Sequence, residues 1–197
     1  MSILKEIAIF ALLAIFAENI VFTRGFGSTE LLTIGTKPKK LLFFGVIITV
    51  FTTFSSLALW PLSKLLLNKD WANYLRGIIF TVCVATLYLL VVFVLKKLLP
   101  ALNERISKLL PIAAFNSLVL AIPFIISPIT QSFFSAVAFG LGAGIGFVLA
   151  AFLLAIGIER INNPDVPSAF RGLPIQLLYI GILSMVFLAF SGHFQFS

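Results

Sequence analysis

Charged residues divide this chain into long apolar stretches separated by short polar segments. Four windows carry no Asp, Glu, Lys or Arg, and they cover residues 41–63, 77–95, 109–158 and 172–197. A bilayer core about 30 Å thick is crossed by roughly 20 apolar residues in a helix. The 50-residue window is therefore too long for a single span. Its polar break at 127–131 contains Pro128, which predicts two helices joined by a tight turn.

The windows, together with an apolar segment at the N-terminus, predict six membrane helices. Their approximate bounds are 3–22, 41–62, 74–95, 107–126, 132–158 and 173–192. The composition agrees, because 60% hydrophobic residues, 11% charged residues and a mean hydropathy of +1.15 exclude a soluble domain of 197 residues. We therefore expect an all-α, polytopic membrane protein whose residues 1–197 form one transmembrane domain.

The distribution of Lys and Arg predicts how these helices are oriented. Ten basic residues fall in connections on one side, namely Arg24, Lys37, Lys39, Lys40, Lys96, Lys97, Arg105, Lys108, Arg160 and Arg171. Four fall on the other side, namely Lys5, Lys64, Lys69 and Arg76. Because positive residues accumulate in cytoplasmic loops, we expect a multi-pass protein of the plasma (inner) membrane with both termini outside the cytoplasm. The net charge of +7 then reflects topology and does not indicate a nucleic-acid partner.

Two short matches indicate an internal repeat. Residues 75–78 and 170–173 both contain Arg-Gly and lie 95 positions apart, and Asn19 and Asn116 lie 97 positions apart. Halves of about 1–97 and 98–197 would each contain three spans, and an odd number inserts the second half in the opposite orientation. We predict an inverted 3+3 repeat with broken first and fourth helices. Such repeats build secondary transporters, with the working site near the midplane.

Four polar residues lie inside predicted membrane helices, at positions where contact with lipid would be unfavourable. Glu18 lies 15 residues beyond Ile3, roughly 22 Å along a helix. It is either part of a cation or proton path or the end of a short, broken first helix, and the two interpretations are compatible. Asn19, Asn116 and Ser117 complete the predicted midplane polar site. The alternative for Asn116 is a hydrogen bond between helices.

A run of small residues predicts close helix packing. Its glycines alternate at Gly140, Gly142, Gly144 and Gly146. Because glycine has no side chain, another backbone can approach the helix closely at these positions. A narrow ion path is the alternative interpretation, since it would also need space without side chains. The chain has one cysteine, Cys83, and one histidine, and it shows neither a metal-ligand cluster nor a Ser-His-Asp set. We therefore predict no catalytic residue and no metal site, and leave open whether the chain is part of an enzyme.

The chain resembles the membrane subunits of the Rnf and Na⁺-translocating NADH:quinone reductase (Rnf/Nqr) complexes, in particular the Rnf A-type and quinone-reductase E-type subunits. The segments that carry the resemblance are 110–117, 140–160, 165–172 and 181–192. The resemblance implies two homologous six-helix subunits of opposite orientation that hold a [2Fe–2S] cluster between them and pass electrons while Na⁺ or H⁺ is moved. It also implies partner subunits that carry flavin or reduce quinone.

This sequence departs from the family at the cluster ligands. Each family member supplies one Cys after the first helix and one just after the Asn of the fourth, and here Thr29 and Ser117 stand at those positions. Hydroxyls are poor substitutes for the thiolates that bind such clusters. We therefore expect no cofactor on this chain alone.

Three functions follow from these observations. The first is a membrane subunit of an ion-translocating electron-transport complex that acts with a homologous subunit or a second copy. The second is a cluster-free paralogue that transports a small ion or metabolite. The third, a vitamin-binding component of an energy-coupling transporter, is disfavoured because the alanines of the first helix recur every three residues.

Overall fold

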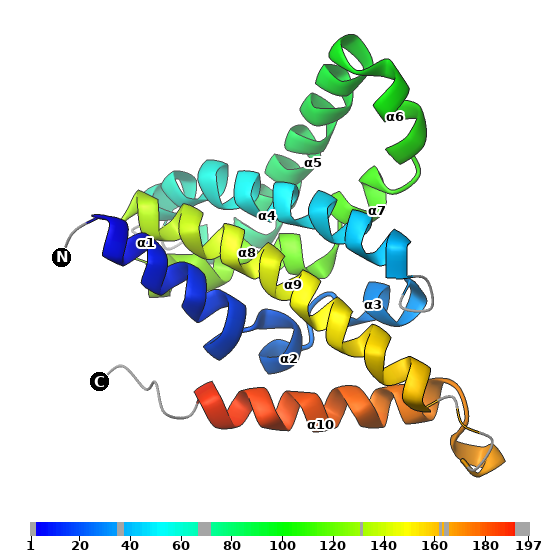
Figure 1. Cartoon of the computed structure of the whole chain (residues 1–197). Helices are drawn as coiled ribbons and strands as arrows, with labels where there is room; N and C mark the ends of the chain where they lie inside the picture. Colours follow the sequence, from blue (N-terminus) through cyan, green and yellow to red (C-terminus); the bar gives the residue numbers. More distant parts are fainter. Residues whose placement is uncertain are drawn as a thin grey trace.

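A computed structural model describes residues 3–34, 38–66, 72–130, 132–161, 163 and 166–191. Every regular element in these ranges is a helix (Figure 1). In chain order they are α1 (Ile3–Leu12), the π-helical turn η1 (Leu13–Ala17), α2 (Ile20–Arg24), α3 (Ser28–Ile34), α4 (Pro38–Leu66), α5 (Ala72–Leu98), α6 (Pro100–Ile106), α7 (Leu110–Ala114), α8 (Ser117–Ile129), α9 (Phe133–Ile161), the 3₁₀ turn η2 (Ser168–Phe170) and α10 (Leu173–Ser191).

Three of the described helices are long and apolar enough to cross a membrane. They are Phe43–Leu66 in α4, Tyr74–Leu98 in α5 and Phe133–Ile161 in α9. A fourth candidate joins Pro100–Ile106 to Leu110–Ile126 through a bend of 73°. The last helix is shorter, with an apolar stretch at Leu173–Ala189. The chain is therefore an all-helical membrane protein, as its composition predicts.

Helices α4 and α9 cross at the centre of the molecule (Figure 1). A Cβ at Gly144 would lie 2.4 Å from the Cα of Thr49, and one at Gly140 would lie 2.2 Å from Oγ of Ser56. Because higher numbers on α9 meet lower numbers on α4, the two helices run antiparallel. Two of the four alternating glycines therefore allow this backbone contact.

The other two glycines face α1 and η1. A Cβ at Gly142 would lie 2.5 Å from the carbonyl oxygen of Ala11, and one at Gly146 would lie 3.1 Å from that of Ala14. In these contacts the residue numbers increase together along the two helices, so α1 and α9 run in the same direction. Helix α9 is therefore enclosed on two sides, and 56% of its apolar window is buried.

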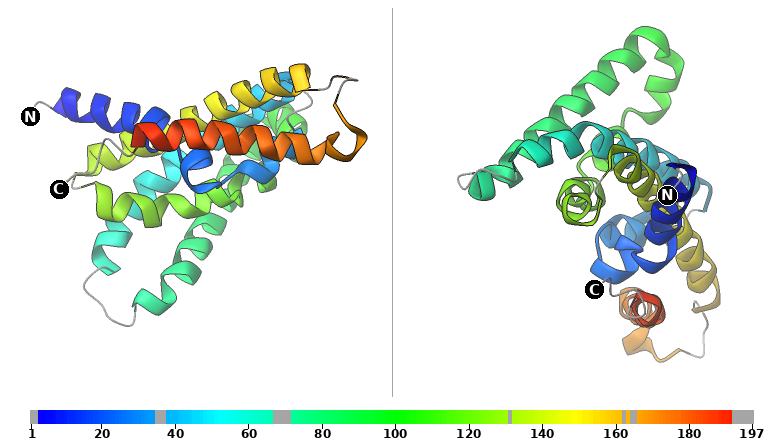
Figure 2. Two further views of the ribbon diagram at one scale, coloured as in Figure 1. Left: turned by 90° about the horizontal axis from the view of Figure 1, so that it is seen from below. Right: turned by 90° about the vertical axis from the view of Figure 1, so that its left-hand side faces the viewer.

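The remaining long helices lie at the periphery. Helix α5 buries only 11% of its apolar window and projects with α6 away from the rest (Figures 1 and 2). Helix α10 packs along α2 and α9, where Phe187 stacks on Phe22 with ring centroids 4.4 Å apart. The Tyr179 hydroxyl donates to the carbonyl oxygen of Leu153 at 3.1 Å. The apolar surfaces of these helices suit contact with lipid or with another protein of the membrane.

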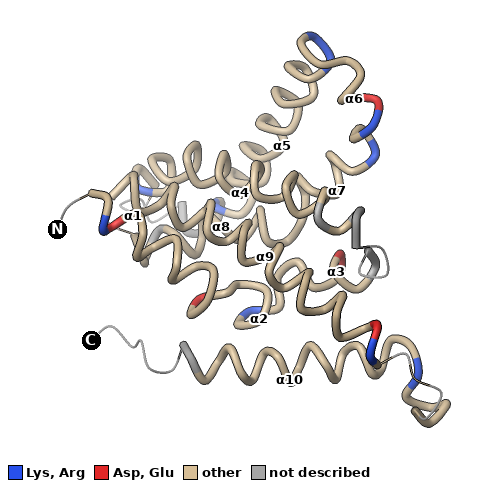
Figure 3. The backbone as a smooth tube through the Cα atoms, viewed as in Figure 1, with Lys and Arg blue, Asp and Glu red and all other residues tan. Residues whose placement is uncertain are grey.

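Charged residues gather at helix ends and connections, and most of α5, α9 and α10 carries none (Figure 3). The two Arg-Gly matches differ in local structure, because Arg76 lies inside α5 whereas Arg171 precedes α10. Gly172 has a φ of +81°, and Gly77 is helical. Segments 75–78 and 170–173 are therefore not equivalent in structure, and of the two sequence matches only the asparagines support a repeat.

Candidate functional site: two helix breaks

The first break interrupts the helix predicted at 3–22. Its last turn, η1, is wound wide, because the Glu18 N–H donates to the carbonyl oxygen of Leu13, five residues earlier, at 2.7 Å. Asn19 then adopts an extended conformation and caps α2, and its Oδ1 accepts from the N–H of Val21 at 3.2 Å. Side-chain capping by Asn satisfies a backbone donor that has no partner within the helix.

The amide nitrogen of Asn19 holds this break in place. Its Nδ2 donates to the carbonyl oxygen of Ile15 at 2.9 Å and to that of Gly146, on α9, at 3.1 Å. The side chain is fully buried, with 0% exposure, and both of its polar atoms have partners. Asn19 thus connects the break to α9. Its buried amide has the hydrogen-bond partners that burial requires.

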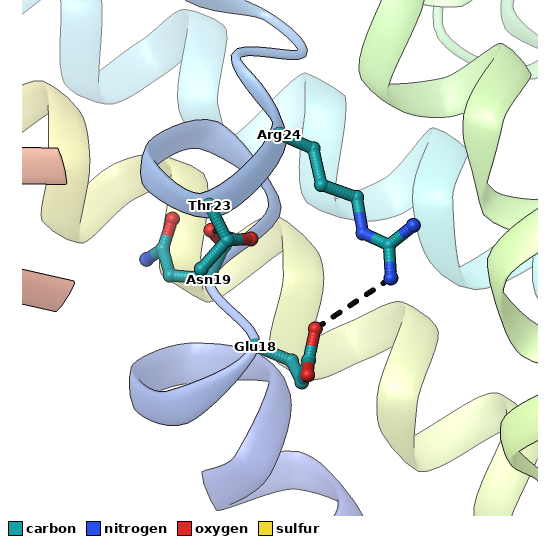
Figure 4. Close-up of polar contacts among 4 residues, drawn as sticks. All are labelled: Glu18, Asn19, Thr23 and Arg24. Carbon is teal, nitrogen blue, oxygen red and sulfur yellow. Dashed lines mark hydrogen bonds and ion pairs between the residues drawn. The ribbon is translucent and has the colours of Figure 1, made fainter. Parts of the chain in front are cut away.

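Glu18 and Arg24 face one another across the break (Figure 4). Glu18 Oε2 lies 3.8 Å from a terminal guanidinium nitrogen of Arg24, and their side chains are 32% and 47% exposed. The separation exceeds a normal hydrogen bond, so the pair is held by charge alone. The Asn19 amide lies on the other side of the break (Figure 4). The carboxylate therefore remains accessible to another cation.

The second break lies between α7 and α8. Its winding is tighter, because the Phe115 N–H donates to the carbonyl oxygen of Pro111, four residues earlier, at 3.0 Å. Asn116 is extended and caps α8, with Oδ1 accepting from the N–H of Leu118 at 2.8 Å. Its Nδ2, however, is buried without a hydrogen-bond partner. The two asparagines thus share a capping role and differ in what their amide nitrogens bind.

The two breaks meet at the turn that follows α2. The Gly27 N–H donates to Oγ of Ser117 at 2.9 Å. Gly27 has a φ of +82°, and a Cβ there would lie 3.0 Å from the ring of Phe147 and 3.4 Å from Oδ1 of Asn116. Only glycine suits both this conformation and this space. A chain of contacts through Gly27 and α9 therefore connects the two breaks.

A groove of about 420 Å³ opens beside this contact. Its lining residues are Arg24 and Phe26 from the first break and its turn, and Ser117, Leu120, Ala121, Phe124 and Ile125 from α8. It is mostly apolar. Ser117 and Thr29, which we expect at the positions of the family's cysteines, are both exposed, and Ser117 already binds the backbone of Gly27. Cys83, the only cysteine, lies on α5.

Sequence reasoning missed Arg24 and Gly27 as site residues. It placed Arg24 in a connection, whereas the break positions its side chain beside Glu18. The sequence did contain a signal for Gly27. Two glycines, Gly25 and Gly27, follow one another closely after α2, and such pairs often mark turns with positive φ. Within the described ranges, no group of three or more His, Cys, Asp or Glu side chains could hold a metal ion.

The fold and the two Asn-capped breaks define a helical membrane protein in which short stretches of irregular backbone interrupt the helices. The chain belongs to the Rnf-Nqr family of membrane protein subunits, whose family model matches residues 7–194. The resemblance that the sequence motifs carry is thereby confirmed.

The relatives are similar over nearly their whole length. The A-type subunit of the ion-translocating oxidoreductase complex of Syntrophotalea carbinolica is 31% identical over 189 residues, which cover 96% of this chain and 98% of that protein. The A-type subunit of the Na⁺-translocating ferredoxin:NAD⁺ oxidoreductase complex of Acetobacterium woodii is 32% identical, covering 91% and 93%. The counterpart from the proton-translocating complex of Clostridium ljungdahlii is 28% identical, with the same coverage.

Proposed function

We propose that this chain is a membrane subunit of an Rnf/Nqr-like ion-translocating electron-transport complex and acts with partner subunits. The observation that carries the proposal is the full-length match to the A-type subunits of ion-translocating oxidoreductase complexes. Those relatives are named as parts of complexes, so a homologous six-helix subunit or a second copy is the expected direct partner. Flavin-carrying or quinone-reducing subunits would complete the electron path.

The proposal includes an inverted 3+3 repeat that crosses the membrane six times. Support comes from the two breaks, since each is followed by a capping Asn and the caps, Asn19 and Asn116, are 97 residues apart. Helices α4 and α9, the second long helix of each half, have 29 residues each and run antiparallel. Irregular backbone within a membrane is tolerated where it is buried in protein or lines a cavity.

We also propose that both termini lie outside the cytoplasm, in a plasma (inner) membrane. The first turn of α1 and the last turn of α10 lie at the same end of the molecule (Figure 1). The start of α4, the end of α9 and the start of α10 lie toward the opposite end (Figure 1). The greater number of positive residues lies in the connections at that opposite end, which supports a cytoplasmic location for it. Of the residues counted, Lys37 and Lys69 lie outside the described ranges.

Glu18, Asn19, Asn116 and Ser117 form the proposed midplane polar site. Glu18 is the C-cap residue of η1, and a helix C-terminus carries partial negative charge that adds to that of the carboxylate. A monovalent cation, Na⁺ or H⁺, is the ligand that this end attracts. The weak pairing with Arg24 supports a carboxylate that can exchange its counter-ion.

The side chains at the family's cluster positions do not fit a [2Fe–2S] cluster. Thr29 and Ser117 offer hydroxyls where thiolates are required, and Ser117 Oγ is bonded to Gly27. We therefore propose that a redox centre, if the complex uses one at this level of the membrane, is held by a partner. The same observation favours a second candidate function, that of a cluster-free paralogue which transports a small ion or metabolite.

Purification of the tagged chain from its native membrane under anaerobic conditions tests these functions. We expect homologous and redox subunits to co-purify, and the reconstituted complex to take up Na⁺ or H⁺ when electrons pass from reduced ferredoxin to NAD⁺. Purification of the chain alone, with ion or metabolite uptake that needs no electron donor, would establish the second function instead. Stoichiometric iron on the isolated chain would contradict the proposal about its cofactor.

A further inference from the structure

The buried amide nitrogen of Asn116 is the one side-chain polar atom at the two breaks that this conformation leaves unsatisfied among the residues described. Asn19 is its counterpart in the first break, and there Nδ2 donates to two carbonyl oxygens. Both residues are 0% exposed. A buried donor without an acceptor is unfavourable, and native structures rarely keep one without a reason.

The difference follows from how the preceding helix is wound. In η1 the bond from Glu18 to Leu13 spans five residues, and this wide turn places the carbonyl oxygen of Ile15 2.9 Å from Nδ2 of Asn19. At the end of α7 the bond from Phe115 spans four residues, and the Asn116 N–H reaches Ala113, three residues back, at 3.4 Å. Tight winding thus leaves the Asn116 amide without the local acceptor that Asn19 has.

We infer that the α7–α8 break has a second conformation, wound wide like η1, in which Nδ2 of Asn116 donates to the carbonyl oxygen of Ile112. Ile112 stands four residues before Asn116, as Ile15 stands four before Asn19. Asn116 is then a positioning residue, since its amide stabilises the wide conformation and is unpaired in the tight one. Wide turns of this kind are frequent at functional sites in helices.

A chain of contacts connects this change to the first break. Gly27 binds Ser117 and lies against Phe147, and the neighbouring Gly146 accepts from Asn19. Rewinding α7 would move Asn116 and Ser117 relative to the Gly27 turn. It would thereby alter the surroundings of α2 and of Arg24 beside Glu18. The break in the second half would in this way control access to the proposed cation site in the first half, a role that rests on the proposed function.

Hydrogen–deuterium exchange of the full-length chain in lipid nanodiscs tests the inference. The reporters are the amides of residues 113–118, which open when α7 rewinds. Asn116→Ser keeps an N-cap acceptor and removes only the amide donor. We expect exchange of these amides to slow by on the order of tenfold, because the tight form loses its unpaired group and the wide form loses its bond.

Asn19→Ser is the matched control, because it also keeps the cap but breaks two existing bonds. We expect it to speed exchange of residues 16–21. If Asn116 has only a structural role, Asn116→Ser will instead speed exchange of residues 113–118, and this result, or no change, would overturn the inference. Asn116→Thr, which keeps the cap and also lacks the donor, repeats the measurement if the Ser variant does not fold.

The exchange result is independent of ion transport, so the two proposals fail separately. Loss of coupled ion uptake in Asn116→Ser together with slowed exchange supports the inference. Slowed exchange with uptake unchanged would remove its role in transport. Absence of electron-driven uptake in the wild-type complex would contradict the proposed function, while the exchange measurement would still decide whether the second conformation exists.

Discussion

The two helix breaks of this protein use the same capping residue for different purposes. In the first, Glu18 precedes the cap and the Asn19 amide is anchored to α9 at the carbonyl oxygen of Gly146. In the second, Phe115 precedes the cap and the amide of Asn116 has no partner. The first break therefore carries a charged pair and an anchored amide nitrogen, whereas the second carries an amide nitrogen without a partner. The two breaks thus share a capping residue and differ in the groups around it.

The packing that anchors the first break is tested by crowding it at Gly146. In Gly146→Ala the new Cβ would lie 3.0 Å from Nδ2 of Asn19 and 3.1 Å from the carbonyl oxygen of Ala14. We expect the free energy of unfolding to fall by about 2–3 kcal/mol, as overpacking of a rigid site costs. Thermal unfolding in detergent measures this. Gly181→Ala on α10, where a Cβ meets nothing within 4 Å, is the control and should not destabilise the protein.

The contact between the breaks is tested by a pair of glycines in one turn. Gly27→Ala introduces both an unfavourable positive φ and a clash with the Phe147 ring at 3.0 Å, whereas Gly25→Ala introduces the φ strain alone. We expect Gly25→Ala to cost about 1–2 kcal/mol. Gly27→Ala should cost more, and the difference measures how tightly the Gly27 turn is packed against Phe147. Equal melting temperatures for the two variants would show that the contact contributes nothing.

The charge of the first break should matter for transport more than for folding. Glu18→Gln keeps the shape of the side chain and removes its charge, so we expect electron-driven ion uptake by the reconstituted complex to fall by about tenfold. Glu104→Gln, an exposed carboxylate on α6, is the matched control and should retain uptake. Normal uptake in Glu18→Gln would exclude this carboxylate from the ion path and would make the two breaks functionally alike.

The smallest effect is expected for the ion pair itself. Arg24 and Glu18 are separated by 3.8 Å and both are partly exposed, so Arg24→Gln should change the free energy of unfolding by less than about 1 kcal/mol. The change should shrink further at high salt, because exposed charges are screened. Thermal unfolding at low and high salt measures this change. A larger loss would mean that the ion pair stabilises the first break more than an exposed pair normally does.

Much of the architecture could be predicted from the sequence. The charge-free windows identified a membrane protein, and Asn19 and Asn116, 97 residues apart, marked the two breaks. The alternating glycines from Gly140 to Gly146 signalled close packing, although not that alternate members face α4 and α1. The Arg-Gly match was a poor guide, because a two-residue motif recurs by chance and takes its conformation from its surroundings.

The sequence alone determined that this chain belongs in a bilayer, because hydropathy is a sum over neighbouring residues and needs no knowledge of the fold. Only the tertiary structure decided what each polar group binds. Asn19 reaches Gly146, 127 residues away, and Gly27 reaches Ser117, 90 residues away. These bonds form because α9 brings both breaks to one place. The winding of the turn before each asparagine differs as well, and the amide nitrogen of Asn116 lacks the local acceptor that Asn19 finds at Ile15.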